Sequence, residues 1–389
     1  MAGSPKMRLF SPLSRETVMP ATQTITWTEF LTQFPKVDLH YHLLGGVRLT
    51  TMRDLARRAG VALSEQEAKS FYRRYQAETG QAKGGIAALN FLYPLLRSPQ
   101  DYYRVMLEVA EDAAATGVRH LELFWNPSDT PLPYDEVTAA LAQGLADAAR
   151  RWEIHALFLP AINREKSPEE AVRMVETVLA HPHPLVAGIG IDYREHDAPI
   201  EHFWKAYRLA QHGGLRLTGH CSEFGLHWRN VESGLDLLQL ERIDHGYSII
   251  DNPALLARYA RAGIPFTVVP SNTYFLKCWP DHDDWRRHHP IRRMAQAGLT
   301  LIPATDDWHM HDTNGAECYR VMVEEFGFDL DGVRHLLANG IDACWQPEAL
   351  KTRWRAQWLA EFDALRARLE REPSPEAGHH LIYQPHHGE

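Results

Sequence analysis

Two histidines stand one residue apart in the segment KVDLHYHLLGG, at His40 and His42. Side chains alternate between the two faces of a strand, so in an extended segment both imidazoles point to the same side. Two imidazoles spaced in this way can bind one metal ion. The chain contains 22 histidines, however, so such pairs also arise by chance, and a structural role is the simpler interpretation of this pair taken alone.

Further metal-type residues follow three other short apolar segments. These groups are His220-Cys221-Ser222-Glu223, Asp244-His245-Gly246 and Thr305-Asp306-Asp307. An imidazole from His220 and a carboxylate from Asp306 would join His40 and His42 in a set of three nitrogens and one oxygen. Such a set suits Zn²⁺, with water in the open position of a catalytic site, although nitrogen and oxygen ligands do not by themselves separate zinc from iron. We expect one zinc ion per chain.

A metal hydrolase also needs groups that carry protons. Glu223 lies three residues after His220 and could reach a substrate without binding the metal; the alternative is an ordinary acid at a helix N-terminus. A neutral His245 could orient the attacking water and take its proton, or it could be a structural histidine bonded to backbone. Asp306 and Asp307 face opposite ways, so one could bind metal while the other contacts substrate.

The elements that must position these residues alternate along the chain. β-type runs are predicted over residues 37–42, 118–124, 154–162, 185–192, 215–221, 242–245, 265–269 and 299–304. Helices are predicted over residues 98–116, 134–152, 199–212, 229–239, 252–262 and 287–297, from Ser167 onward, and within 63–97 and 328–371. Eight repeats without a GxGxxG or GxxxxGK loop predict an α/β fold, a closed (β/α)₈ TIM barrel with extra helices after strand one and at the C-terminus. Active-site residues of such barrels lie at the C-terminal ends of strands, where all four groups fall.

Composition limits the classes of function. The 389 residues carry 41 basic and 50 acidic side chains, a net charge of −9, which argues against non-specific binding to nucleic acid or anionic membranes. Four separated cysteines without a CxxC pair indicate a reducing compartment rather than a disulfide framework. No apolar run has the length of a signal peptide core or a membrane span. We expect a cytoplasmic protein acting on a small molecule; homo-oligomerisation stays open.

The same considerations divide the chain into three parts. Residues 1–25 are expected to form a flexible N-terminal arm, residues 26–371 a single metal-dependent domain, and residues 372–389 a polar tail with four histidines.

Taken together, these motifs resemble the adenosine and AMP deaminase family of metal-dependent barrels. The resemblance runs roughly from Phe34 to Phe326 and includes TGHCSE, RIDHGYSI, VVPSNTYFL and HPIRRMAQAGLTLIPATDD. It implies hydrolytic removal of an amino group from a purine-like ring, with release of ammonia. It implies that Glu223 protonates the ring nitrogen beside the reacting carbon, that His245 is the base and partner of the zinc hydroxide, and that Asp307 bonds a ring nitrogen on the far edge. The implied zinc ligands are His40, His42, His220 and Asp306.

Three positions depart from the family's pattern. Leu44 stands where adenosine deaminases use an acid for the sugar's 5′-hydroxyl, Glu195 lies in a stretch where a glycine usually meets the purine, and Trp308 replaces a common proline. Leu44 cannot accept a hydrogen bond, so plain adenosine is not the expected substrate. We expect Leu44, Glu195 and Trp308 to contact the substrate, with Glu195 reading an extra amino or imino group or, alternatively, pairing with Arg194.

Several alternatives stay open at this point. The aromatic side chains after strands seven and eight could cover a flat ring or simply pack a long loop; they are Tyr274, Phe275, Trp279, Trp285 and Trp308. His309 and His311 could suggest a second metal, but related binuclear barrels use a bridging lysine, and no lysine stands at a central strand end. Other interpretations are a zinc hydrolase acting on an amide or cyclic amidine, and a non-catalytic binding protein that kept the barrel, which would predict a broken metal set.

Overall fold

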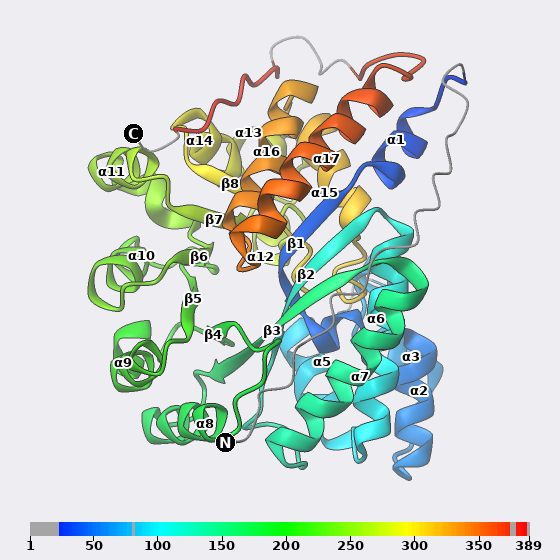
Figure 1. The fold of residues 1–389 in the computed structure, drawn as a ribbon, viewed down its shortest axis with the longest axis vertical. Coiled ribbons are helices and arrows are strands. Elements are labelled where there is room, and N and C mark those ends of the chain that lie inside the picture. The colour runs from blue at the N-terminus through cyan, green and yellow to red at the C-terminus, as the bar shows by residue number, and fades with distance from the viewer. Residues whose placement is uncertain (1–22, 80–81, 374–378, 387–389) are drawn as a thin grey trace, which may run out of the picture.

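Eight parallel strands form one sheet, in which they follow the order of the chain from β1 to β8 (Figure 1). The structure is a computed structural model, and it describes residues 23–79, 82–373 and 379–386. The strands are β1 (Lys36–His42), β2 (Val118–Trp125), β3 (His155–Asn163), β4 (Gly188–Asp192), β5 (Arg216–Cys221), β6 (Arg242–His245), β7 (Pro265–Val268) and β8 (Thr300–Pro303). An isolated bridge between Tyr41 and Asp306 joins the last strand region to the first. The predicted (β/α)₈ barrel is confirmed.

Helices cover the outside of this barrel. The crossover helices are α6 (Pro99–Ala115), α7 (Tyr134–Trp152), α8 (Pro168–Ala180), α9 (Trp204–His212), α10 (Arg229–Glu232), α11 (Pro253–Arg261) and α14 (Pro290–Gln296). After β1 the chain adds α2 (Leu49–Arg58), α3 (Glu65–Lys69), α4 (Arg73–Thr79) and α5 (Gly85–Leu92). The last three lie within the predicted segment of residues 63–97, whereas α2 precedes it. In Figure 1 helices α8 to α11 lie along the left and α16 (Leu330–Ala343) and α17 (Glu348–Arg366) lie above the strands.

The crossover helix α6 shows why the sequence folds locally as predicted. In α6, Ser98 and Asp101 form a capping box and Pro99 takes the first helical position, where its missing N–H costs nothing. The helix ends before Gly117, whose φ of 81° favours glycine. Its buried face, which includes Tyr102 and Val105, packs on the barrel. The residues that begin α6, those that end it and its apolar face therefore all favour the same helix.

Some predicted bounds are wrong. The helix expected over residues 287–297 is two helices, α13 (His282–His288) and α14, which meet at His289 and Pro290. Proline has no N–H to donate and pushes the preceding residue out of the helical region, and His289 has a ψ of 127°. The helix expected over 229–239 is the short α10 followed by a π-helical turn over Ser233–Leu237.

The described residues near both ends of the chain include side chains that are buried against the barrel domain. Residues 1–22 of the predicted arm and residues 374–378 and 387–389 of the predicted tail lie outside the described residues. Ile25 is buried and pairs with Leu369. In the C-terminal segment Leu381 and Tyr383 are buried against the barrel, so residues 379–386 contact the fold.

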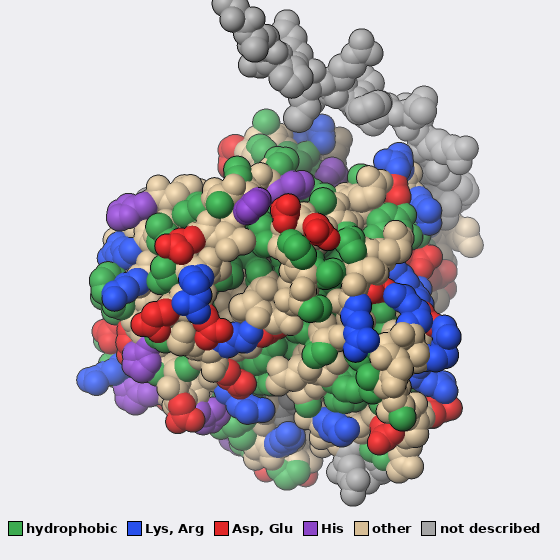
Figure 2. Space-filling model, turned by 90° about the horizontal axis from the view of Figure 1, so that it is seen from below, with side chains coloured by type: hydrophobic (Ala, Val, Ile, Leu, Met, Phe, Trp, Pro, Cys, Tyr) green, Lys and Arg blue, Asp and Glu red, His purple; other side chains and the backbone are tan. Residues whose placement is uncertain are grey.

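Surface chemistry is mixed on the face seen in Figure 2, where acidic, basic and hydrophobic side chains are interspersed. Among the described residues, no helix has the length and apolar character needed to cross a membrane.

Candidate metal centre and its pocket

Three imidazoles and one carboxylate converge at the C-terminal end of the barrel. His220 Nε2 lies 3.0 Å from His40 Nε2 and 3.1 Å from His42 Nε2, and Asp306 Oδ1 lies 3.1 Å from His42 Nε2 and 3.5 Å from His40 Nε2. Nitrogen donors on one tetrahedral zinc lie about 3.3 Å apart, because Zn–N bonds are about 2.0–2.1 Å. The four residues predicted as ligands therefore form a buried cluster of the right size for a divalent metal.

Strand geometry explains the convergence. His40 and His42 share a face of β1, His220 comes from the end of β5, and Asp306 follows β8. Several strand ends then turn through left-handed backbone at non-glycine residues, which are Tyr193 after β4 (φ 70°), Ser222 after β5 (58°), His245 in β6 (69°) and Asp306 after β8 (61°). Such conformations cost of order 1–3 kcal/mol each and cluster at functional sites, where they aim side chains.

Each ligand imidazole meets a second polar group through its other nitrogen. His40 Nδ1 is 3.0 Å from Thr267 Oγ1, His42 Nδ1 is 3.6 Å from Asp192 Oδ2, and His220 Nδ1 is 3.7 Å from Asp244 Oδ2. Partners of this kind orient metal-binding histidines. The ring of Phe124 lies 5.4 Å from the rings of His40 and His42 and 5.5 Å from that of His220, so it underlies the cluster.

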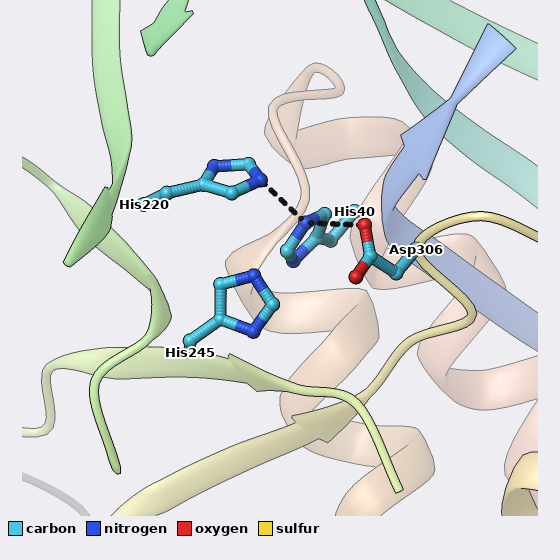
Figure 3. Close-up of side chains that lie close together, drawn as sticks. All are labelled: His40, His220, His245 and Asp306. Atoms are coloured by element: carbon cyan, nitrogen blue, oxygen red, sulfur yellow. Dashed lines mark hydrogen bonds and ion pairs between the residues drawn. The ribbon is translucent and has the colours of Figure 1, made fainter. Parts of the chain in front are cut away.

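His245 lies beside the same cluster, and Figure 3 shows it facing His40, His220 and Asp306. These four side chains offer donor atoms that lie within 4.8 Å of one another, so distance alone would admit His245 as a ligand. His42 makes the two 3.1 Å approaches described above, which favours it over His245 as the predicted ligand. Burial and the neighbouring His40 hold the pKa of His245 well below its usual range, so this imidazole is neutral.

A pocket opens over the cluster. Glu223 lines it, with Oε2 3.7 Å from His245 Nε2 and Oε1 accepting a 3.4 Å hydrogen bond from Asn272 Nδ2. Burial, followed by the nearby Asp306 and Glu195, raises the pKa of Glu223 well above its usual range. A raised pKa favours the protonated form of the carboxyl group, which can donate a proton.

Asp307 lies in the same pocket, against two glycines. A Cβ on Gly45 would stand 2.2 Å from Asp307 Oδ1, and a Cβ on Gly85 would stand 2.1 Å from Oδ2. Burial and the adjacent Asp306 raise the pKa of Asp307. Gly85 begins α5, so the helices inserted after β1 help to shape the pocket.

The structure does not bring every predicted contact to the pocket lining. Leu44 is buried within a 3₁₀ turn, and Trp308 is buried 5.6 Å from the Tyr41 ring. Glu195 Oε2 accepts a 2.9 Å hydrogen bond from Ser222 N, and Oε1 lies 3.4 Å from Arg164 Nη1, so Glu195 supports the turn after β5. None of these three lines the pocket, and their contact with substrate stays a prediction.

Arg194 lines the pocket and lies 3.5 Å from Glu165, rather than pairing with Glu195. The five aromatic residues of the loops after β7 and β8 do not line it, and Phe275 and Trp279 stack on each other at 5.5 Å, which favours loop packing. Sequence reasoning missed other lining residues, which are Lys83, Ile86, Tyr193, Phe224 and Lys277. Ile86 lies in the inserted helix α5, Lys277 lies in α12 (Thr273–Cys278) after β7, and the other three lie in loops, where sequence patterns give no signal of direction.

Comparison with known proteins places this geometry in context. Residues 35–357 match the family described as adenosine deaminase. An adenine deaminase from Albidiferax ferrireducens is 31% identical over 294 residues, covering 75% of this chain and 83% of the relative, and one from Cupriavidus necator is 29% identical over 341 residues, covering 86% and 93%. The crystal structure of an amidohydrolase from Burkholderia ambifaria, with bound zinc, is 44% identical with a TM-score of 0.84, covering 92% of this chain and 97% of that one.

Proposed function

The chain belongs to the adenosine deaminase family, and from this we propose that it is a zinc-dependent hydrolase that replaces an amino group on a purine-like ring by oxygen and releases ammonia. The observation that carries the proposal is the convergence of the four metal-type side chains with Glu223 and His245 at one end of the barrel. The net reaction consumes one water and breaks one C–N bond.

We propose one catalytic zinc ion per chain, held by His40, His42, His220 and Asp306. The donor spacing described above fits the ion, and the Burkholderia ambifaria relative binds zinc. Zinc supplies Lewis-acid activation of the attacking water at neutral pH. Burial and the neighbouring imidazoles lower the pKa of His220 well below its usual range, which keeps this ligand neutral.

Glu223 is proposed to donate a proton to the ring nitrogen next to the reacting carbon. Its raised pKa supports this role, because the acid must be protonated before the substrate is attacked. Protonation of that nitrogen makes the neighbouring carbon more electrophilic. Neutral His245, 3.7 Å from Glu223, is proposed to orient the attacking water and to accept its proton.

Asp307 is proposed to bond a ring nitrogen on the far edge of the substrate. Its carboxyl lies in the pocket and, with its raised pKa, can donate a hydrogen bond to an unprotonated ring nitrogen. Leu44 offers no acceptor for a ribose hydroxyl, which supports an aminopurine or modified nucleoside over plain adenosine.

The test is ammonia release from zinc-loaded protein across adenine, adenosine, AMP, aminopteridines and their nucleosides. AMP belongs in the panel because three basic side chains, Lys83, Arg194 and Lys277, line the pocket. Turnover of an aminated heterocycle supports the proposal; its failure with every member overturns the substrate class. Mass detection separates a hydrolase of amides or cyclic amidines, because opening a ring adds one water to the substrate and cleaving an open-chain amide gives an acid and an amine. A non-catalytic binder would change no compound.

The proposal also includes a cytoplasmic location, which the cysteine content supports. Cell fractionation tests the location, and sedimentation of the purified protein tests whether copies associate.

A further inference from the structure

A second group of metal-type side chains lies beside the first. Asp306, Asp307 and His311 offer donor atoms within 4.8 Å of one another, and all three residues are buried. His311 Nδ1 is 3.9 Å from Asp306 Oδ2, and His311 Nε2 is 3.8 Å from Asp307 Oδ2. Asp307 and His311 both line the pocket, so this group faces the space where a substrate would bind.

The turn after β8 brings His311 to this position. His311 N donates a 2.7 Å hydrogen bond to Asp307 O, which folds the chain back over the strand end. Within the turn, Trp308 and Met310 point into the core, whereas His309 reaches Asp112, with Nε2 2.9 Å from Oδ2. The two histidines of this segment therefore have different surroundings, and only His311 lines the pocket.

Polar atoms in this group lack partners. His311 Nδ1 and Asp307 Oδ1 are buried without a hydrogen bond among the described residues, and His311 and Asp307 are only 5% and 7% exposed. Burying a polar atom without a partner costs about 1–3 kcal/mol, so such atoms indicate a missing ligand. Asp306 can serve both groups, because its Oδ1 faces the imidazoles of His40 and His42 while its Oδ2 faces His311.

We propose that Asp306, Asp307 and His311 form a second, weaker divalent-cation site that overlaps the substrate's place in the pocket, so that excess cation inhibits the enzyme. The proposed inhibition rests on the proposed function, whereas the proposed binding of a second cation does not. Asp306 would bridge the two ions, in the manner of two-metal sites whose ions lie about 3.5–4 Å apart. The carboxyl groups of Asp306 and Asp307, both in the pocket lining, would offset the added charge once ionised.

The second site is weaker because its donors are further apart. Donors on one zinc lie about 3.0–3.6 Å apart, given bonds of about 2.0–2.2 Å. The catalytic group already meets this spacing at 3.0–3.5 Å. In the second group the 3.9 Å distance to Asp306 starts from His311 Nδ1 and the 3.8 Å distance to Asp307 starts from Nε2, and one ion can bind only one of these nitrogens. The donor atoms, which lie within 4.8 Å of one another, must therefore close around an ion by side-chain rotations. Catalytic zinc therefore binds first, and the second site fills only at higher concentration.

The test measures zinc bound per chain by equilibrium dialysis and elemental analysis, starting from protein that holds one equivalent. The wild type is expected to take up a second equivalent, and His311→Gln is expected to weaken that uptake at least about tenfold, the lower end of what losing even an outer partner of a metal costs. His309→Gln is the matched control and should bind like the wild type. Asp307→Asn should also lose the second equivalent, and thermal unfolding checks that each variant is folded.

Activity gives an independent readout once a substrate is identified. Excess Zn²⁺ should inhibit the wild type and His309→Gln competitively with substrate, and the inhibition constant should rise in His311→Gln by the same factor as the loss of binding. The proposal is overturned if the wild type stays at one equivalent, or if His311→Gln takes up the second equivalent as the wild type does. Because dialysis needs no substrate, this failure is distinct from a failure to release ammonia.

Discussion

At the scale of single residues, Glu223 is the side chain whose surroundings most directly suit a chemical task. It is buried in the pocket, it lies near Asp306 and Glu195, and these surroundings raise its pKa. Its carboxyl oxygen Oε1 accepts a long hydrogen bond of 3.4 Å from Asn272 Nδ2. These surroundings favour the protonated carboxyl group that a proton donor requires.

Replacing Glu223 by Gln should remove the proton donor and leave the metal in place. The amide keeps the size of the side chain but has no proton to give, so we expect kcat to fall by about 10²–10⁴-fold with the bound zinc unchanged. Steady-state ammonia release and elemental analysis measure the two quantities. Glu232→Gln on α10, outside the pocket lining, is the control; a fully active Glu223→Gln would refute the role given to Glu223.

At the scale of elements, a buried histidine, His289, lies at the break between α13 and α14. His289 accepts a 3.3 Å hydrogen bond from Ile291 N through Nδ1 and so caps α14. Its ring packs among aromatic rings, with centroids 4.7 Å from Phe326 and 5.1 Å from Phe275. Burial lowers the pKa of His289 to about 3, so the folded state holds this imidazole neutral.

This junction should make stability depend on pH. The unfolded chain protonates His289 below about pH 6.5, whereas the folded chain does so only near pH 3, so the free energy of unfolding falls as pH falls between these values. One such group contributes a slope of about 1.4 kcal/mol per pH unit.

His289→Asn keeps a capping oxygen and removes the titration, so its unfolding free energy should fall less steeply from pH 6 to pH 4. Urea unfolding at several pH values measures the slope, and equal slopes for the two proteins would contradict the assignment.

The elements show how far sequence reasoning reaches. Strands and crossovers follow apolar patterns and caps, so β1, β5, β6 and β8 were predicted closely, and with them the ends that bring His40, His220 and Asp306 together. No comparable sequence pattern shows which way a side chain in a loop will point. Glu195 and Leu44 are expected to contact substrate because of their place in the sequence, and this stays a prediction. Nothing in the sequence indicated that Glu195 would accept a hydrogen bond from Ser222 N or that Leu44 would be buried in a 3₁₀ turn.

At the scale of the whole molecule, the C-terminal segment joins the end of the barrel opposite the pocket. The hydroxyl of buried Tyr383 donates to Leu299 O and accepts from Leu301 N and Asn339 Nδ2, all at 2.8 Å. The composition of residues 372–389 predicted a polar tail, and a tyrosine among histidines, prolines and glycines gave no periodic signal that it would be buried. The segment thus ties β8 to α16 at their far end.

Tyr383→Phe should therefore lower stability without altering catalysis. Removing the hydroxyl leaves buried partners at Leu301 and Asn339 unsatisfied, which is expected to lower the free energy of unfolding by about 1–3 kcal/mol. Denaturant unfolding measures this loss, and kcat/KM should match that of the wild type. An unchanged midpoint, or a loss of activity in fully folded protein, would contradict the structural role.

The contact between the end of β1 and the segment after β8 links the proposed metal centre to closure of the barrel. His42 N donates to Asp306 O at 2.9 Å and Asp306 N donates to His40 O at 3.0 Å, so the residues that close the barrel are also among the proposed metal ligands. An ion bound there fastens the first strand to the last, and its removal should speed amide hydrogen exchange along this contact before elsewhere. During synthesis the ligand set exists only after β8 has left the ribosome, so uptake of the ion marks the moment at which the barrel is complete.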